Sequence, residues 1–170
     1  ISVYPARGAS AHVYRWLGIM RPAPMPEAMR ETLTRPGVAV FIEHQGSAGD
    51  RKPCIHTLCP DLRSPMDWHT AVSHLAEAYT AAFRAYAESP PGYRMLRLCP
   101  LCDDHRAGHY RRHIQALTAA ALAQALARIP WTHLAGVRDI SLCVYDPAQA
   151  RAYHQALCAA APPIQEAVSY

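Results

Sequence analysis

Lysine is almost missing from this chain. Of its 17 basic residues only Lys52 is a lysine, and the others are arginines. The arginine guanidinium presents a planar pair of N–H donors that matches phosphate and carboxylate groups. Alanine and proline are abundant too, as in a GC-rich coding sequence, so composition alone does not establish a recognition role. The net charge of +4 is only mildly basic and excludes the dense positive charge of a histone-like tail.

Long apolar runs are also absent. No stretch of about 18 uncharged apolar residues occurs, which predicts that no segment spans a membrane. A signal-peptide pattern is missing as well. The chain starts at Ile1 rather than at Met, so we expect a piece of a longer protein. Because domains contain roughly 100–200 residues, we expect residues 1–170 to form a single domain.

The sequence signatures of several enzyme classes are missing. There is no HExxH or GxSxG motif, and the glycine-containing stretch 46–50 lacks the GxxxxGK[ST] pattern of a phosphate loop. A zinc deaminase needs H-x-E followed by PCxxC. Here His74 and Glu77 are one residue too far apart, and Leu98 stands where that proline would be. We therefore expect a binding module rather than an enzyme.

The cysteines carry the clearest pattern. Cys99 and Cys102 enclose Pro-Leu in a CxxC turn, and Cys54 and Cys59 form an upstream pair around His56. Structural zinc sites take four ligands in tetrahedral geometry, commonly thiolates, and a CxxC turn can place two sulfurs on one ion. We expect Cys54, Cys59, Cys99 and Cys102 to bind one structural zinc ion. The other two cysteines, in an expected strand and helix, should be structural thiols.

The second cysteine pair comes directly before an expected helix, whose N-terminus favours the thiolate form. A knuckle followed by a second knuckle at a helix start resembles, over these ligand turns, a treble-clef finger. His56, His105 or His109 could replace one of the upstream cysteines, and the sequence leaves this open. Metal-binding thiolates indicate a reducing compartment, so we expect an intracellular protein of the cytoplasm or nucleus.

A redox role is the rival interpretation of the CxxC turn. Strand, CxxC and helix follow one another as in the active turn of thioredoxin, and a proline between the cysteines is common there. Against this, only one clear strand follows the turn, whereas a thioredoxin fold needs several. A thiol oxidoreductase therefore stays as an alternative.

Hydrophobic periodicity predicts a mixed chain. Helices are expected at 27–34, 65–88, 103–129 and 147–160, and strands at 38–42, 93–98 and 137–145. A weak alternation at 13–17 allows a further strand. The core face of the second helix should contain Trp68, Val72, Leu75, Tyr79, Phe83 and Tyr86. We predict an α+β fold in which about four helices pack on a small mixed sheet beside a treble-clef-like zinc site.

Basic residues are densest just after the CxxC turn, on the expected helix 103–129. They are Arg106, His109, Arg111, Arg112 and His113. On an α-helix His105, His109 and His113 would share one side. We expect this cluster to contact phosphate, as in nucleic acid, or an acidic protein partner, within a regulatory or nucleic-acid-associated protein. A merely solvated helix face and a protein–protein adaptor without nucleic-acid binding are the alternatives.

Overall fold

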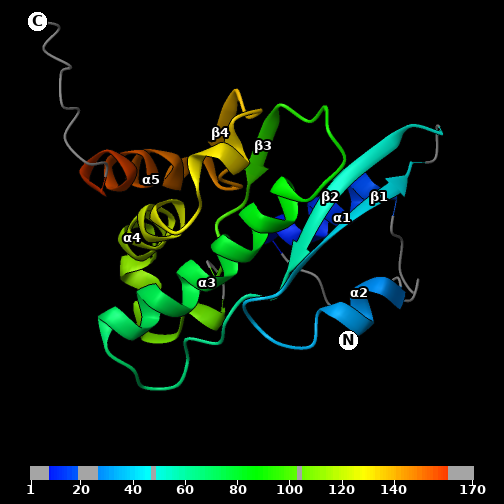
Figure 1. The fold of residues 1–170 in the computed structure, drawn as a ribbon. Helices are drawn as coiled ribbons and strands as arrows, with labels where there is room; N and C mark the ends of the chain where they lie inside the picture. The colour runs from blue at the N-terminus through cyan, green and yellow to red at the C-terminus, as the bar shows by residue number, and fades with distance from the viewer. Residues whose placement is uncertain (1–7, 19–26, 47–48, 103–104, 161–170) are drawn as a thin grey trace, which may run out of the picture.

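The computed structural model describes residues 8–18, 27–46, 49–102 and 105–160 (Figure 1). The fold is α+β, as predicted. The helices in these ranges are α1 (Gly8–Leu17), α2 (Glu27–Thr32), α3 (Trp68–Ala87), α4 (Ile114–Ala127), α5 (Pro147–Ala160) and the 3₁₀ segments η1 (His105–His113) and η2 (Trp131–Leu134). The strands are β1 (Ala39–Gln45), β2 (Arg51–Thr57), β3 (Met95–Leu98) and β4 (Asp139–Leu142).

In place of the predicted single mixed sheet, the described ranges form two separate two-stranded sheets. Strands β1 and β2 form an antiparallel hairpin, whereas β3 and β4 pair in parallel. A parallel pair needs a long crossover between its strands, and here η1 and α4 supply it. Figure 1 shows the hairpin on one side of α3 and the helices α4 and α5 on the other.

The main core lies between α3 and α4. Leu75, Tyr79 and Phe83 of α3 are fully buried, because apolar residues recur on one side of this helix. Leu117 of α4 is fully buried too, and α4 is apolar nearly all round because it packs between α3 and α5. Leu96 and Leu98 of the short parallel sheet join the same cluster. A smaller cluster forms where Met29 and Leu33, in and just after α2, contact partly buried side chains of β1.

The hairpin has both of its faces covered, as the unbroken apolar run at 38–42 predicts. Val40 and Ile42 pack against the small cluster beside α2, while Ile55 packs against the main core. The turn is closed by Gly49, which has a φ of +76° and donates a 2.9 Å hydrogen bond to the Gly46 carbonyl. Such a left-handed conformation suits glycine because it has no Cβ.

Several expected elements differ from those observed. Residues 13–17 belong to α1 rather than to a strand; Leu17, near its end, is buried. Helix α3 begins at Trp68 rather than Pro65, because the Asp67 side chain accepts the Thr70 N–H and caps the first turn. Strand β2, which includes Cys54, is not among the strands expected from the sequence.

The expected helix 103–129 is divided, and its residues 103–104 lie outside the described ranges. Its first part is the 3₁₀ segment η1, which is interrupted at Gly108 (φ 55°, ψ −132°). Regular α-helix starts only at Ile114. No helix in the described part of the chain is long and apolar enough to cross a membrane.

Candidate functional site: a cysteine junction beside a basic segment

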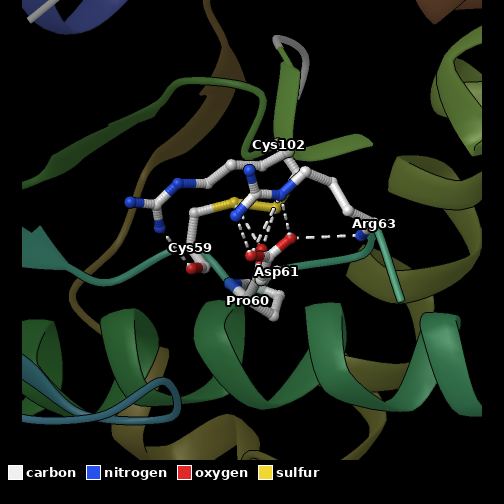
Figure 2. Close-up of polar contacts among 6 residues, drawn as sticks. Cys59, Pro60, Asp61, Arg63 and Cys102 are labelled. Atoms are coloured by element: carbon white, nitrogen blue, oxygen red, sulfur yellow. Dashed lines mark hydrogen bonds and ion pairs between the residues drawn. A yellow bond between two sulfur atoms is a disulfide. The ribbon is translucent and has the colours of Figure 1, made fainter. Parts of the chain in front are cut away.

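Two of the four predicted zinc ligands are joined by a disulfide. Cys59, which follows β2, is bonded to Cys102 at the end of the CxxC turn, with their Cα atoms 5.9 Å apart (Figure 2). The Cys102 sulfur also lies 3.1 Å from the Pro60 carbonyl oxygen. The disulfide connects segments separated by 43 residues in the sequence. We call the four residues Cys54, Cys59, Cys99 and Cys102 the cysteine junction.

The other two predicted ligands are thiols that interact electrostatically. Burial, and to a smaller extent the charge of Cys99, raises the pKa of the Cys54 thiol to about 12. Cys54 is in turn a cause of the raised pKa of Tyr14 in α1, although burial is the larger cause there. The cysteines are therefore brought together in two pairs, each with one upstream and one downstream member. In this environment Cys54 is a neutral thiol at pH 7.

The CxxC turn is fixed by contacts with two other elements. The buried Tyr79 hydroxyl of α3 accepts a 2.9 Å hydrogen bond from the Leu101 N–H. Just before the turn, the Leu98 carbonyl accepts a 2.7 Å bond from the Cys143 N–H, which extends the parallel pairing. Cys102 itself has a φ of +59°, which is uncommon for a residue with a side chain. The position of its sulfur is thus set by the backbone around it.

The basic residues are attached directly to the cysteine junction. The Arg106 guanidinium donates a 2.9 Å hydrogen bond to the Cys59 carbonyl, and the Leu62 N–H donates a 3.0 Å bond to the Arg106 carbonyl. Close packing continues at Gly108, where an added Cβ would lie 2.6 Å from the Leu62 carbonyl oxygen. We call residues 106–113 the basic segment, and these contacts hold its first half against the chain that follows β2.

One acidic side chain lies beside this attachment. Asp61 is exposed and receives two hydrogen bonds, of 2.8 and 3.1 Å, from Nε of Arg63 (Figure 2). Hydrogen bonds from Arg63 hold the pKa of this carboxyl well below its usual range, with a smaller contribution from Arg106. Asp61 therefore stays ionised at neutral pH and is engaged by Arg63.

The second half of the basic segment faces solvent. His109, Arg111, Arg112 and His113 are exposed, whereas Tyr110 between them is buried and donates a hydrogen bond to the Met66 carbonyl. The predicted α-helical alignment of His105, His109 and His113 is wrong, because η1 has 3₁₀ geometry and a kink at Gly108. Within the described residues, Arg111 and Arg112 form no ion pair or hydrogen bond with other side chains, so both guanidinium groups point to water.

The hairpin contains a buried histidine pair that the sequence motifs do not predict. The Nε2 atoms of His44 and His56 are 2.9 Å apart, and the Tyr14 ring stacks on His56 at a centroid distance of 6.2 Å. Burial lowers the pKa of both imidazoles, that of His56 to about 4. The alternation of Lys52, Cys54 and His56 was the available signal, since it places their side chains on one face of a strand. His56, weighed above as a zinc ligand, instead contacts His44.

No group of three or more His, Cys, Asp or Glu side chains arranged to hold a metal ion occurs among the residues that the structure describes. The side chain of His105 lies outside them. Cys143, just after β4, and Cys158, in α5, were expected to be structural thiols and are instead exposed. Comparisons with protein-family models, curated proteins and solved structures gave no match to this chain.

Proposed function

We propose that this chain is a zinc-binding module that presents a basic segment to an anionic partner, either nucleic acid or an acidic protein. In the reduced protein, Cys54, Cys59, Cys99 and Cys102 bind one structural zinc ion. The zinc fixes the chain after β2 against the CxxC turn. The exposed residues of the basic segment then contact the partner, so the module binds rather than catalyses.

The observation that carries this proposal is the attachment of Arg106 to Cys59. One backbone segment holds both a predicted zinc ligand and the carbonyl that receives the guanidinium. A change at the cysteine junction therefore reaches the basic segment directly through the Arg106–Cys59 hydrogen bond. Because the Leu62–Arg106 backbone bond and the close approach of Gly108 follow directly, the two regions behave as one unit.

The donor set suits zinc once the disulfide is reduced. Thiolates are the preferred ligands of structural zinc, and all four sulfurs belong to the two segments that meet here. Cys54 and Cys99 already interact electrostatically. Bound zinc would supply the positive charge that allows a buried thiol such as Cys54 to ionise. Such a site requires a reducing, intracellular environment.

Metal analysis of the reduced protein tests the zinc site. Protein purified with a thiol reductant and zinc should contain one equivalent of zinc, and each of the changes Cys54→Ser, Cys59→Ser, Cys99→Ser and Cys102→Ser should lower this content. Cys143→Ser and Cys158→Ser are matched controls, because both residues are exposed thiols outside the cysteine junction. Zinc loss that is equal in the controls, or zinc absent from the wild type, would contradict the proposal.

Salt dependence tests the anionic partner. Contacts between arginine and phosphate release counterions, so affinity for a polyanion falls steeply as salt rises. We expect the double change Arg111→Ala and Arg112→Ala to weaken binding to heparin and to flatten this dependence. Arg84→Ala and Arg151→Ala, exposed residues of α3 and α5, serve as the charge-matched control. Equal effects of the two double variants would argue for a merely solvated segment.

Thiol–disulfide exchange is the second candidate, and the Cys59–Cys102 disulfide favours it. Attack of a Cys99 thiolate on the Cys102 sulfur would form the Cys99–Cys102 bond and release Cys59 as a thiolate, with no external oxidant. Catalysed reduction of insulin by a dithiol, lost in Cys99→Ser, would support this role. If neither zinc-loaded nor zinc-free protein catalyses insulin reduction, thiol–disulfide exchange is excluded and the zinc-binding function is retained.

A further inference from the structure

The exposed part of the basic segment contains aromatic rings as well as charges. Trp68, at the start of α3, contacts Tyr110 edge-on with the ring centroids 5.9 Å apart. The imidazole of His109 also contacts the Tyr110 ring, and the two ring centroids are 4.0 Å apart. Tyr110 is buried and is fixed through its hydroxyl to the Met66 carbonyl. A buried, anchored ring thus supports one exposed ring from α3 and one from η1.

Trp68 is the unexpected member of this group. Its place in the periodic pattern of α3 puts it on the core face, yet 42% of its surface is exposed. The residues that continue that face, such as Val72 and Leu75, are buried. Trp68 thus leaves apolar surface exposed to water, and its partner Tyr110 is followed directly in the chain by two exposed arginines. This combination has the composition of a recognition surface rather than of a core edge.

The 3₁₀ geometry of η1 aligns charge with the exposed ring. Residues three apart eclipse one another in a 3₁₀ helix, so His109 and Arg112 lie on one side of η1. Arg111 is the neighbour of Tyr110 on the same short turn. We call Trp68, His109, Arg111 and Arg112 the ring-and-arginine surface. Trp68 contacts Tyr110, which stands between His109 and Arg111 in the sequence, so flat rings and guanidinium groups come from adjoining parts of the structure.

We propose that the ring-and-arginine surface binds single-stranded nucleic acid, with bases stacked on Trp68 and His109 and phosphates held by Arg111 and Arg112. This inference rests on the proposed anionic partner and chooses between its two classes. Proteins that bind single strands combine a basic track with aromatic side chains on which successive bases stack. An acidic protein would need the guanidinium groups only, and the bases of a duplex are stacked inside it and unavailable to Trp68.

The binding experiment uses the whole 170-residue chain and short, dye-labelled oligothymidylate and oligouridylate. Polyglutamate and a duplex of mixed sequence are the competing polyanions. We expect both single strands to bind more tightly than either competitor at equal ionic strength. Trp68→Leu should weaken single-strand binding about tenfold, since one stacked base contributes roughly that factor. The same change should leave polyglutamate binding unaltered.

Matched variants separate stacking from charge and from folding. Trp131→Leu is the aromatic control, because Trp131 is the most exposed tryptophan and lies on η2. Trp68→Phe keeps a ring, so it should retain most of the affinity while losing the quenching of tryptophan fluorescence that nucleic acid causes. Removing Arg111 and Arg112 together should reduce the salt slope by about 1.4, the value for two phosphate contacts on a single strand.

The outcomes are distinguishable. Equal binding of polyglutamate and single strands, unaffected by Trp68→Leu, overturns this inference while keeping the proposed anionic partner. Tighter binding of the duplex also overturns it. Failure of every polyanion to bind overturns the anionic partner itself. If Trp68→Leu lowers the melting temperature, Trp68→Phe decides: retained affinity with lost quenching supports stacking, and unchanged quenching contradicts it.

Discussion

His44 and His56 face each other inside the hairpin, with their Nε2 atoms 2.9 Å apart. One imidazole must donate its N–H and the other must accept it, so the contact requires at least one neutral ring. The rings come from strand positions that are not opposite each other, since His44 pairs with Lys52 and His56 with Val40. The hairpin is therefore expected to be sensitive to acid.

Lowering the pH should destabilise the metal-free protein through His56. Its pKa falls from 6.5 to about 4 on folding, chiefly because of burial and then because of His44. The unfolded chain thus binds the proton more readily, and the stabilisation present above pH 6.5 is lost as the pH falls through 4, by up to about 3 kcal/mol. Urea unfolding at a series of pH values measures this. His56→Gln should flatten the dependence, and His133→Gln, at an exposed position, should not.

Loss of the disulfide should destabilise the oxidised, metal-free protein. A cross-link that spans 43 residues restricts the unfolded chain and contributes about 4 kcal/mol. We expect Cys59→Ser and Cys102→Ser to lower the free energy of unfolding by similar amounts in a denaturant titration. Cys143→Ser should change it by less than about 0.5 kcal/mol. An unchanged stability of both junction variants would show that the disulfide does not form in solution.

Gly108→Ala should disturb the attachment of the basic segment. The added Cβ would lie 2.6 Å from the Leu62 carbonyl oxygen and 2.8 Å from the Arg63 Cα, on a residue with a φ of +55°. Both the clash and the strained φ destabilise, and we expect a loss of about 1–3 kcal/mol together with weaker polyanion binding. Gly136→Ala is the control, because its Cβ would meet nothing within 4 Å. Equal melting temperatures for the two variants would be incompatible with this packing.

Tyr79→Phe should loosen the CxxC turn. The buried hydroxyl accepts the Leu101 N–H, so its removal leaves a donor unsatisfied at a cost of about 1–3 kcal/mol. We also expect lower zinc affinity in the reduced protein, measured by competition with a chromophoric chelator. Tyr145→Phe, at an exposed ring, should affect neither quantity. If Tyr79→Phe lowers the stability but leaves the zinc affinity unchanged, the turn does not contribute to the metal site and this prediction is contradicted.

The sequence predicted those helix ends that are fixed by capping residues and prolines close to them in the chain. The final helix begins at Pro147 as expected, with Asp146 accepting the Ala148 N–H. The buried face of α3 also follows from its apolar spacing, apart from Trp68, which is exposed, and Tyr86, which is only partly buried. Residues 13–17 were ambiguous because a short apolar run fits either a strand or one side of a helix. Their helical form is a result of packing that the run does not reveal.

Contacts that depend on how separate segments align could not be predicted from the sequence. The meeting of the segment around Cys59 with the CxxC turn was predicted from ligand spacing, and the structure brings them together. Whether zinc joins the four cysteines remains a prediction. The His44–His56 contact depends on how two strands align, and the exposure of Trp68 depends on where Tyr110 lies. Neither follows from the spacing of residues within one segment.

The parallel pairing of β3 with β4 has a consequence for the order in which the chain acquires its structure during synthesis. In the described chain β3 has no other strand partner, and β4 ends at Leu142. A nascent chain emerges from the ribosome with its N-terminal part first. The strand pairing that supports the CxxC turn at the end of β3 must therefore wait until the whole crossover has been translated, whereas the contact of the turn with Tyr79 of α3 can form earlier. During that interval the upstream partners Cys59 and Tyr79 are the contacts available to the turn, so the cysteine junction can assemble before the parallel sheet does.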